Sequence, residues 1–143
     1  MTSDLCIRPA VSVDLNALVA LENSCFETDR LTRRQLRYML ARAQAVMLVA
    51  AATPAASGGA PGVLAIAALL GYVLVLFNRA TSVARLYSIA VAAPARGQGI
   101  GRALVEAAEQ ATWDAERAYL RLEIRRDNVP SQRLFEGLGY RRF

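Results

Sequence analysis

The spacing of apolar and polar residues changes along the chain between a period of two, typical of strands, and a period near 3.6, typical of helices. Strands are predicted where apolar runs are rich in β-branched and aromatic residues. These runs cover residues 5–10, 45–52, 69–77, 82–92 and 119–125. Pro9 is expected to stop the first of them, because proline lacks the N–H group that a strand ladder needs.

The last two predicted strands show a two-residue period. In the strand at 82–92, alternation is expected to place one set of side chains on a single face: Val83, Arg85, Tyr87, Ile89 and Val91. The strand at 119–125 is expected to divide its side chains between two faces, with Leu120, Leu122 and Ile124 on one and Arg121, Glu123 and Arg125 on the other.

Helices are predicted at about Val13–Cys25, 31–43, Gly101–Arg117 and 129–139. Ser12 is expected to cap the first helix, and Thr32 followed by Gln35 forms a capping-box pattern before the second. The last helix has Pro130 in its first turn and Gly139 at its end, which are the usual places of these two residues. Residues 140–143 are expected to begin a last strand.

The order of these elements is β α α β β β α β α β. It predicts an α/β fold in which a mixed sheet carries helices on both faces. We expect one domain over residues 1–143, with a flexible loop at 53–61 that enlarges a hairpin connection. The longest apolar run, Gly62–Phe77, is shorter than the roughly 20 residues of a membrane-spanning helix, so no membrane contact is expected.

Composition limits the kinds of function. The formal net charge is +5, which favours an anionic partner and leaves nucleic acid and a phosphorylated cofactor open. The chain has no histidine, which excludes histidine metal sites and histidine triads. Two cysteines, Cys6 and Cys25, are too few for a disulfide framework and indicate reduced thiols in a cytoplasmic protein. The first ten residues lack the apolar core of a signal peptide.

Three glycines, Gly97, Gly99 and Gly101, stand two residues apart between a predicted strand and a predicted helix. The N–H groups at a helix start lack partners within the helix and attract anions, and glycine lets a phosphate approach that backbone. Arg96 and Arg102 add positive charge beside it. The spacing fits neither the Walker loop nor the dinucleotide fingerprint, whose third glycine position is Arg102 here.

What remains is the pattern R-x-x-G-x-G, formed by Arg96, Gly99 and Gly101. With this loop, the chain resembles a GNAT-superfamily N-acetyltransferase, in which the loop cradles the pyrophosphate of acetyl-coenzyme A. Residues 120–143 resemble the segment L-E-V-R-x-x-N-x-x-A-x-x-L-Y-x-x-x-G-F of the ribosomal-protein alanine N-acetyltransferase branch. The resemblance covers nearly the whole chain and is strongest from about Arg85 to Phe143.

The resemblance implies acetyl transfer from acetyl-coenzyme A to a primary amine, without a metal. It places Glu123 as the general base, since it occupies the glutamate position of L-E-V-R. A backbone N–H near Ile89, Ala90 or Val91 would stabilise the oxyanion, and Asn128 would hold the pantetheine arm or cap the next helix. The loop residues expected at the coenzyme are Arg96, Gly97, Gln98, Gly99, Ile100, Gly101 and Arg102.

The chain departs from the family pattern at two points. The family has a tyrosine after leucine in its fourth helix, where it protonates the leaving thiolate, whereas Leu134 is followed here by Phe135. Phe135 is therefore expected beside the coenzyme but without a proton to give, and Tyr140 and Tyr87 are the tyrosines that remain as donors. The family also continues after this point into two further strands, which leaves open that the chain is a fragment lacking C-terminal strands.

Three functions remain open. The first is an N-acetyltransferase whose acceptor amine is a protein N-terminus or a lysine, acting as a monomer or homodimer. The second, suggested by Phe135, is a non-catalytic acyl-coenzyme A-binding or regulatory domain. The third is nucleic-acid binding, which the charge suggests, but the arginines are spread through the chain and their clusters lack interleaved aromatic residues.

Overall fold

The computed structural model describes residues 5–28, 30–42, 44–52, 69–124 and 128–141. The elements are β1 (Leu5–Pro9), a 3₁₀ turn η1 (Ser12–Asp14), α1 (Leu15–Cys25), α2 (Arg33–Ala41), β2 (Ala45–Ala52), β3 (Leu69–Phe77), β4 (Val83–Val91), a 3₁₀ turn η2 (Ala93–Ala95), α3 (Ile100–Asp114), β5 (Tyr119–Leu122) and α4 (Val129–Gly137). This order confirms the predicted succession from the first strand to the last helix. The loop expected at 53–61 and the end of the strand expected at 140–143 lie outside the described residues.

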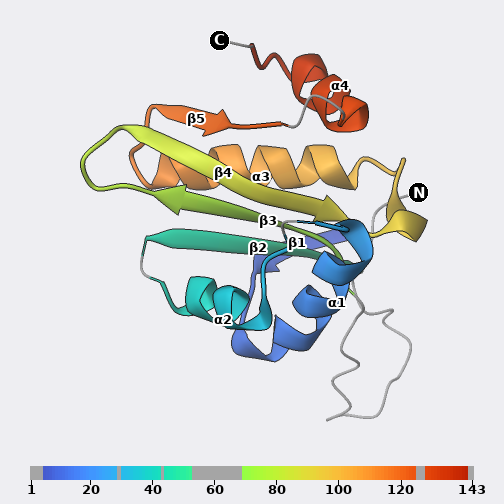
Figure 1. The fold of residues 1–143 in the computed structure, drawn as a ribbon. Helices are drawn as coiled ribbons and strands as arrows, with labels where there is room; N and C mark the ends of the chain where they lie inside the picture. The colour runs from blue at the N-terminus through green and yellow to red at the C-terminus, as the bar shows by residue number, and fades with distance from the viewer. Residues whose placement is uncertain (1–4, 29, 43, 53–68, 125–127, 142–143) are drawn as a thin grey trace.

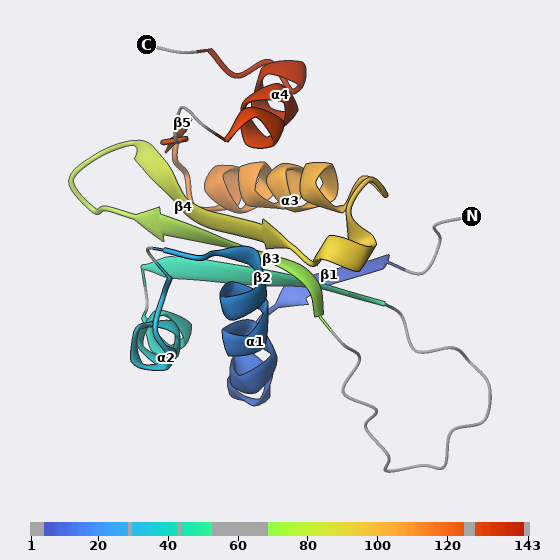
Figure 2. The ribbon, with the colours of Figure 1, turned by 45° about the vertical axis from the view of Figure 1, so that its right-hand side comes forward.

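The five described strands form one sheet in the order β1-β2-β3-β4-β5. Neighbouring strands are antiparallel except β4 and β5, which are parallel. Helices α3 and α4 lie on one side of the sheet and α1 and α2 on the other (Figures 1 and 2). The predicted mixed sheet with helices on both faces is therefore confirmed. Among the described residues, none of the helices combines the length and apolar character that crossing a membrane requires.

Strand β3 lies at the centre of the sheet and is buried on both faces. Val73 and Val75 belong to the apolar cluster beneath α3, while Tyr72 and Leu74 belong to the cluster against α1 and α2. A strand covered on both sides has no solvent-facing position, which explains why its sequence is almost continuously apolar.

Strand β4 contains a bulge that the sequence pattern does not reveal. Leu74 of β3 pairs with Ser88 and Val75 pairs with Leu86, so Tyr87 is an extra residue on β4. The bulge exchanges the two faces of the strand. Before it Leu86 points into the cluster beneath α3, and after it Ile89 does so. The predicted single face of Val83, Arg85, Tyr87, Ile89 and Val91 is therefore wrong.

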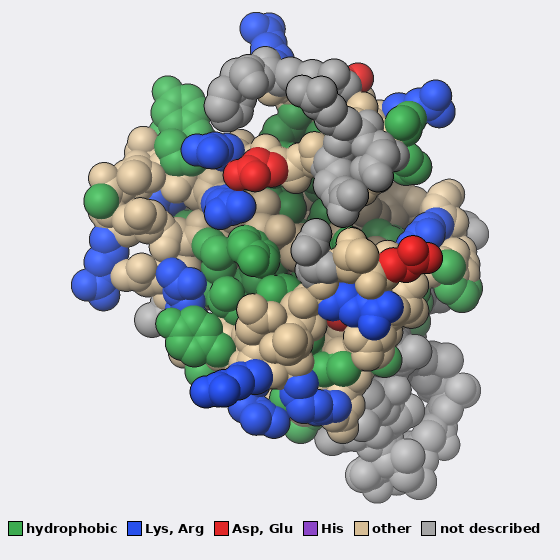
Figure 3. All heavy atoms as spheres, in the orientation of Figure 1, with side chains coloured by type: hydrophobic (Ala, Val, Ile, Leu, Met, Phe, Trp, Pro, Cys, Tyr) green, Lys and Arg blue, Asp and Glu red, His purple; other side chains and the backbone are tan. Residues whose placement is uncertain are grey.

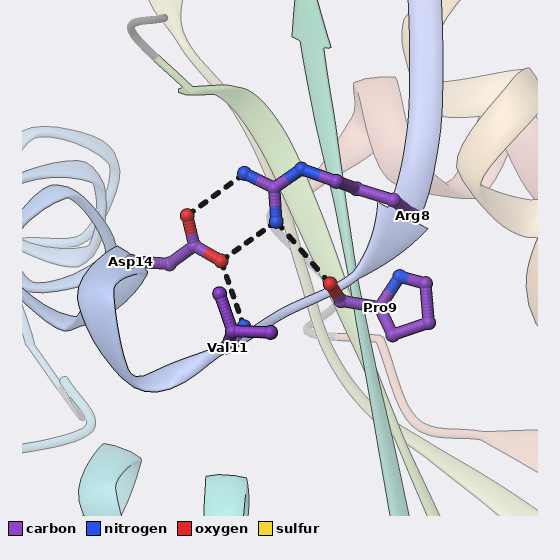
Figure 4. Close-up of polar contacts among 4 residues, drawn as sticks. All are labelled: Arg8, Pro9, Val11 and Asp14. Atoms are coloured by element: carbon purple, nitrogen blue, oxygen red, sulfur yellow. Dashed lines mark hydrogen bonds and ion pairs between the residues drawn. The ribbon is translucent and has the colours of Figure 1, made fainter. Parts of the chain in front are cut away.

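The start of α1 also differs from the prediction, because Asp14 rather than Ser12 organises it. One carboxylate oxygen of Asp14 accepts the N–H of Val11 at 2.8 Å. The guanidinium of Arg8 reaches both carboxylate oxygens, at 2.8 and 2.9 Å (Figure 4). Asp14 is 1% exposed, so this ion pair fastens the first helix to β1.

We expect the Asp14→Asn variant to lose about 1–3 kcal/mol of unfolding free energy at pH 7, nearer the low end because Arg8 is partly exposed. The hydrogen bonds from Arg8 hold the pKa of Asp14 below its usual range, although burial opposes them. A lowered folded-state pKa adds stability above the unfolded pKa, about 3.9, which is lost as the pH falls through the folded value. Urea unfolding at pH 7 and pH 3 measures the difference.

The exposed carboxylate of Asp114 provides the control. Asp114→Asn should leave the unfolding free energy nearly unchanged at both pH values. An equal loss for Asp14→Asn at pH 7 and pH 3 would contradict the assigned role of the Asp14 charge.

The helix boundaries follow from their capping contacts. Thr32 and Gln35 form the predicted capping box, with bonds of 3.1 and 2.9 Å. Helix α3 ends at Asp114, three residues before the predicted Arg117, because Glu116 takes a left-handed conformation with φ 58°. The N–H of Arg117 then donates back to the carbonyl of Thr112, as in a Schellman motif. No glycine marks this turn, so the sequence pattern predicted a helix that is too long at its C-terminal end.

Candidate active site

The two parallel strands of the sheet, β4 and β5, separate halfway along β4. The pairing of β4 with β5 ends at Leu86 and Leu122, whereas β4 continues to Val91 (Figure 1). The N–H of Ala92 donates to the carbonyl of Leu70 at 2.8 Å, on the β3 side. Because backbone groups alternate along a strand, the N–H groups of Ile89 and Val91 point to the edge that β5 has left. The same alternation turns the N–H of Ala90 toward β3.

The carbonyl of Val91 lies on this open edge and holds two neighbouring segments. It accepts a hydrogen bond from Nε of Arg96 at 3.0 Å and one from the thiol of Cys25 at 3.5 Å. The first contact ties the glycine loop to the end of β4, and the second ties the last turn of α1 to the same point. The end of β4 is therefore the place where the loop and α1 meet.

The glycine loop has a left-handed backbone at two of its glycines. Gly97 and Gly99 have φ of 82° and 80°, in the left-handed region that favours glycine. Gly99 is the N-cap of α3, and the first intrahelical bond runs from the N–H of Ala103 to its carbonyl at 3.1 Å. The N–H groups of the first helical residues, Ile100 to Arg102, thus have no acceptor within the helix.

The space beside this backbone is open at two of the glycines. A Cβ atom built on Gly97 or Gly99 would meet no heavy atom within 4 Å. The backbone is thus open at these residues, and the helix start supplies N–H groups and the positive end of the helix dipole. Gln98 is exposed, whereas the side chain of Ile100 is buried, so Ile100 offers only its N–H.

Gly101 has a different structural reason. A Cβ atom there would lie 3.3 Å from Cδ2 of Leu134 and 3.8 Å from Cγ2 of Val91. This glycine therefore lets α4 and the end of β4 approach the first turn of α3. The prediction assigned all three glycines to a phosphate, and the structure adds a packing requirement for Gly101.

Two arginines flank the loop. Arg96 is exposed, and its bond to the Val91 carbonyl fixes its guanidinium beside the loop. Arg102, in the first turn of α3, pairs with Glu106 one helical turn on at 3.0 Å. Asn128 is the N-cap of α4, where its side-chain oxygen accepts the N–H of Ser131 at 3.2 Å. The structure thus shows the capping role that the sequence offered for Asn128.

Glu123 follows the last residue of β5, and its side chain is 66% exposed. Its neighbours Leu122 and Ile124 pack into the cluster beneath α3, so Glu123 lies on the opposite face, toward α1. One carboxylate oxygen lies 3.4 Å from Arg85 and 3.7 Å from Arg121. The carboxylate is therefore held between two guanidinium groups and remains open to solvent.

Phe135 is 3% exposed and lies in the core between α4 and β5. A hollow of about 630 Å³ is lined by both Phe135 and Glu123. The ring of Phe135 meets that of Tyr140 edge-on, with centroids 5.2 Å apart. The fourth helix thus brings Phe135 to the same hollow as the candidate base.

Of the two tyrosines considered as proton donors, Tyr140 is hydrogen-bonded to Glu109 and Tyr87 lies against Arg85. The hydroxyl of Tyr140 donates to Glu109 at 2.7 Å, and burial together with Glu109 raises the pKa of Tyr140. Tyr87 is the bulged residue of β4. The guanidinium carbon of Arg85 lies over the ring of Tyr87, 5.3 Å from the ring centroid. Neither observation supports these tyrosines as acids for a thiolate.

The structure also reveals a buried polar group that sequence reasoning missed. Glu22 is 1% exposed and accepts the N–H of Leu31 at 2.7 Å. The hydroxyl of Tyr72 bonds to the other oxygen of Glu22 and lies 2.8 Å from Oγ of Ser88. The available signal was an acidic residue at an apolar position of the α1 pattern. In the part of the chain that the structure describes, no three histidine, cysteine or acidic residues gather as metal ligands.

A comparison with protein-family models decides the family. The model of the acetyltransferase (GNAT) family matches residues 15–140. The chain belongs to the GNAT acetyltransferase family. The split between β4 and β5 and the glycine loop before α3, which the resemblance in sequence associates with acetyl-coenzyme A, are both present in the structure. No curated protein matches the chain by sequence.

Solved GNAT structures resemble the chain in fold. The ribosomal-protein-S18-alanine N-acetyltransferase of Escherichia coli is 21% identical, with TM-score 0.73, over 94% of this chain and 76% of that one. The PaiA N-acetyltransferase of Thermoplasma acidophilum, solved with coenzyme A, is 15% identical, with TM-score 0.78, over 96% and 89%. An aminoglycoside 6'-N-acetyltransferase of Acinetobacter baumannii is 18% identical, with TM-score 0.74, over 96% and 91%.

Proposed function

We propose that the protein transfers an acetyl group from acetyl-coenzyme A to a primary amine. One observation carries the proposal: within a GNAT fold, the open edge of β4 ends beside a left-handed glycine loop at the start of a long helix. The contact of Arg96 with Val91 joins these two features at 3.0 Å. An acetyl thioester and its pyrophosphate need one such feature each.

The residues divide the work of binding. The N–H groups of the loop and of Ile100 to Arg102 would hold the pyrophosphate, with Arg96 and Arg102 beside it. The open N–H of Ile89 or Val91 would donate a hydrogen bond to the thioester oxygen and so stabilise the negative charge that builds there during attack. Asn128 and Phe135 would border the pantetheine arm where α4 approaches the loop.

Glu123 is the proposed general base. An α-amine has a pKa near 8 and a lysine amine near 10.4, so both are mostly protonated at neutral pH and must lose a proton before attack. The exposed carboxylate of Glu123 can take this proton directly or through water. Overall, the ammonium loses two protons, one reaching the coenzyme thiolate and one reaching solvent, while the C–S bond breaks and the C–N bond forms.

The acceptor is proposed to be a protein N-terminus or a lysine. One structural neighbour is an S18-alanine N-acetyltransferase and another is an aminoglycoside 6'-N-acetyltransferase, so the names of both specify acetylation at nitrogen. The resemblance of residues 120–143 to the alanine-acetylating branch favours a peptide acceptor. Cytoplasmic location and a monomeric or homodimeric state remain predictions of the sequence.

Release of the coenzyme thiol tests the function. The protein is incubated with acetyl-coenzyme A and a panel of peptides with free N-termini, lysine peptides and small amines. Amine-dependent thiol release is the expected result. Tight coenzyme A binding without release by any amine would support the alternative, a non-catalytic acyl-coenzyme A-binding domain suggested by Phe135.

Nucleic-acid binding receives no support from the face of the molecule seen in Figure 3. On the face seen in Figure 3, arginine side chains lie between apolar and neutral ones and do not form a continuous stripe. A nucleic-acid backbone would need such a stripe of positive charge.

The variant Phe135→Tyr tests whether a thiolate acid is missing. Restoring a phenol with a pKa near 10 next to a thiolate with a pKa near 8.5 should raise turnover, by up to about 10²-fold. A buried hydroxyl without a partner would instead cost about 1–3 kcal/mol of stability. Steady-state rates and thermal melts on one preparation distinguish the two outcomes.

Phe77→Tyr is the matched control, since Phe77 lies in the same apolar cluster at the end of β3. It should lower the melting temperature without raising the rate. A lower melting temperature and an unchanged rate for Phe135→Tyr would mean that protonation of the thiolate does not limit this enzyme.

A further inference from the structure

A chain of three polar groups runs from the buried side of α1 to β4. Glu22 and Tyr72 are 1% and 0% exposed, whereas Ser88 is only partly buried. Leu31 donates its N–H to one oxygen of Glu22 at 2.7 Å, and the hydroxyl of Tyr72 bonds to the other. Tyr72 and Ser88 are in hydrogen-bond contact at 2.8 Å. The chain therefore ends at Ser88, the most exposed of its three members.

The carboxylate gives this chain a direction. Glu22 uses both of its oxygens as acceptors, one for the N–H of Leu31 and one for the hydroxyl of Tyr72. A phenol has a single proton, and Tyr72 gives it to Glu22. In the contact with Ser88 the oxygen of Tyr72 must then accept, and the hydroxyl of Ser88 must donate. Ser88 consequently offers only lone pairs to a further partner.

Ser88 lies close in sequence to the open edge of β4, so the direction of its hydrogen bond bears on the proposed reaction. It follows the bulged Tyr87 and precedes Ile89, whose N–H points to the open edge of β4. The residue of β3 that pairs with Ser88 is Leu74, which belongs to the apolar cluster against α1. Ser88 therefore lies on the face that also carries Glu123, and both residues come just after the last pair of β4 and β5, Leu86 and Leu122.

We propose that Oγ of Ser88 accepts a hydrogen bond from the acceptor amine, with Tyr72 and Glu22 as positioning residues; this rests on the proposed function. An amine attacks through its lone pair, so its N–H groups must find acceptors. A serine free to rotate could donate its proton to that lone pair and block the attack. The carboxylate of Glu22, acting through Tyr72, keeps the Ser88 proton turned away.

The variant Ser88→Ala tests the contact. We expect kcat/KM for the amine to fall by about 3- to 10-fold, mainly because KM rises; this is the contribution of one hydrogen bond. The dissociation constant for coenzyme A should not change. Ser88→Thr keeps the hydroxyl on a strand and should retain most of the activity. Ser24→Ala, which removes an exposed hydroxyl on α1, is the control and should behave as the wild type.

The variant Glu22→Gln tests the direction of the chain. A glutamine can keep its oxygen on Leu31 and turn its NH₂ group toward Tyr72, which frees the Tyr72 proton for Ser88. Ser88 would then donate outward, and kcat/KM should fall at least as far as in Ser88→Ala. The double variant should be no slower than the slower single variant, because without the Ser88 hydroxyl the reversal has no effect on the amine. Circular dichroism establishes that each variant is folded.

The outcomes separate this proposal from the proposed function. If the wild type turns over no amine, both are overturned. If the wild type turns over an amine and Ser88→Ala has the wild-type KM and kcat, only the role of Ser88 is overturned. Independent, multiplying effects of Glu22→Gln and Ser88→Ala would overturn the directed chain, since a purely structural Glu22 would act separately from Ser88.

Discussion

Replacing Glu123 by glutamine is expected to lower amine turnover by about 10²-fold or more near neutral pH, the scale of general-base catalysis. The side chain keeps its size and lies at the surface, so the fold and the affinity for coenzyme A should be preserved. The loss should shrink as the pH approaches the pKa of the acceptor amine, because the amine then loses its proton without help. Turnover of variant and wild type is measured across this pH range.

Glu116→Gln is the matched control, since Glu116 is an exposed glutamate at the end of α3. It should follow the wild type at every pH. A constant ratio of Glu123→Gln to wild-type turnover across the pH range would reduce Glu123 to the ion pairs that it forms with Arg85 and Arg121.

Replacing Gly99 by valine is expected to weaken coenzyme A binding by about 10²-fold. A β-branched residue rarely adopts the φ of 80° seen here, so the loop backbone must change and its N–H groups must turn away. Each hydrogen bond to a charged phosphate contributes about 1.5–3 kcal/mol, so one or two lost bonds account for the change. Titration calorimetry with coenzyme A measures it.

Gly99 is a cleaner test than Gly101. A valine at Gly101 would press against Leu134 and lower stability as well as affinity, whereas the space beside Gly99 is open. Gly137→Val, in open space on α4, controls for the loss of a glycine and should bind coenzyme A normally. Wild-type affinity in folded Gly99→Val would mean that the loop does not hold the pyrophosphate.

The sequence predicted those parts of the fold that depend on local patterns. The order of strands and helices follows from hydrophobic periods, and the start of α2 follows from the capping box of Thr32 and Gln35, which lie three residues apart in the sequence. The face of Glu123 follows from the alternation around Leu122 and Ile124.

The remaining features depend on contacts that the local sequence does not contain. The bulge at Tyr87 exists because β4 must pair with β3 on both sides of it. Asp14 organises the start of α1 because β1 brings Arg8 to it. The left-handed turn at Glu116 lacks the glycine that usually marks such a turn.

The candidate site likewise contains one feature that the local sequence predicts and one that depends on tertiary packing. The glycine loop is contiguous in sequence, so its spacing predicts an anion cradle, and the structure shows a left-handed, open backbone at Gly97 and Gly99. Glu22, Tyr72 and Ser88 are 50 and 16 residues apart, and only the packing of α1 against the sheet brings them together. An isolated glutamate in an apolar stripe gave no indication of its partners.

Mass spectrometry with isotopically labelled acetyl-coenzyme A tests the central claim most directly. All 17 basic residues of the chain are arginines, so a label found on any lysine must lie on the acceptor and not on the enzyme. We predict that the labelled acetyl group appears in an amide bond on an N-terminus or a lysine of the acceptor, with equal release of coenzyme thiol. Thiol release that leaves every amine unlabelled would contradict the account, because it would reveal a thioester hydrolase.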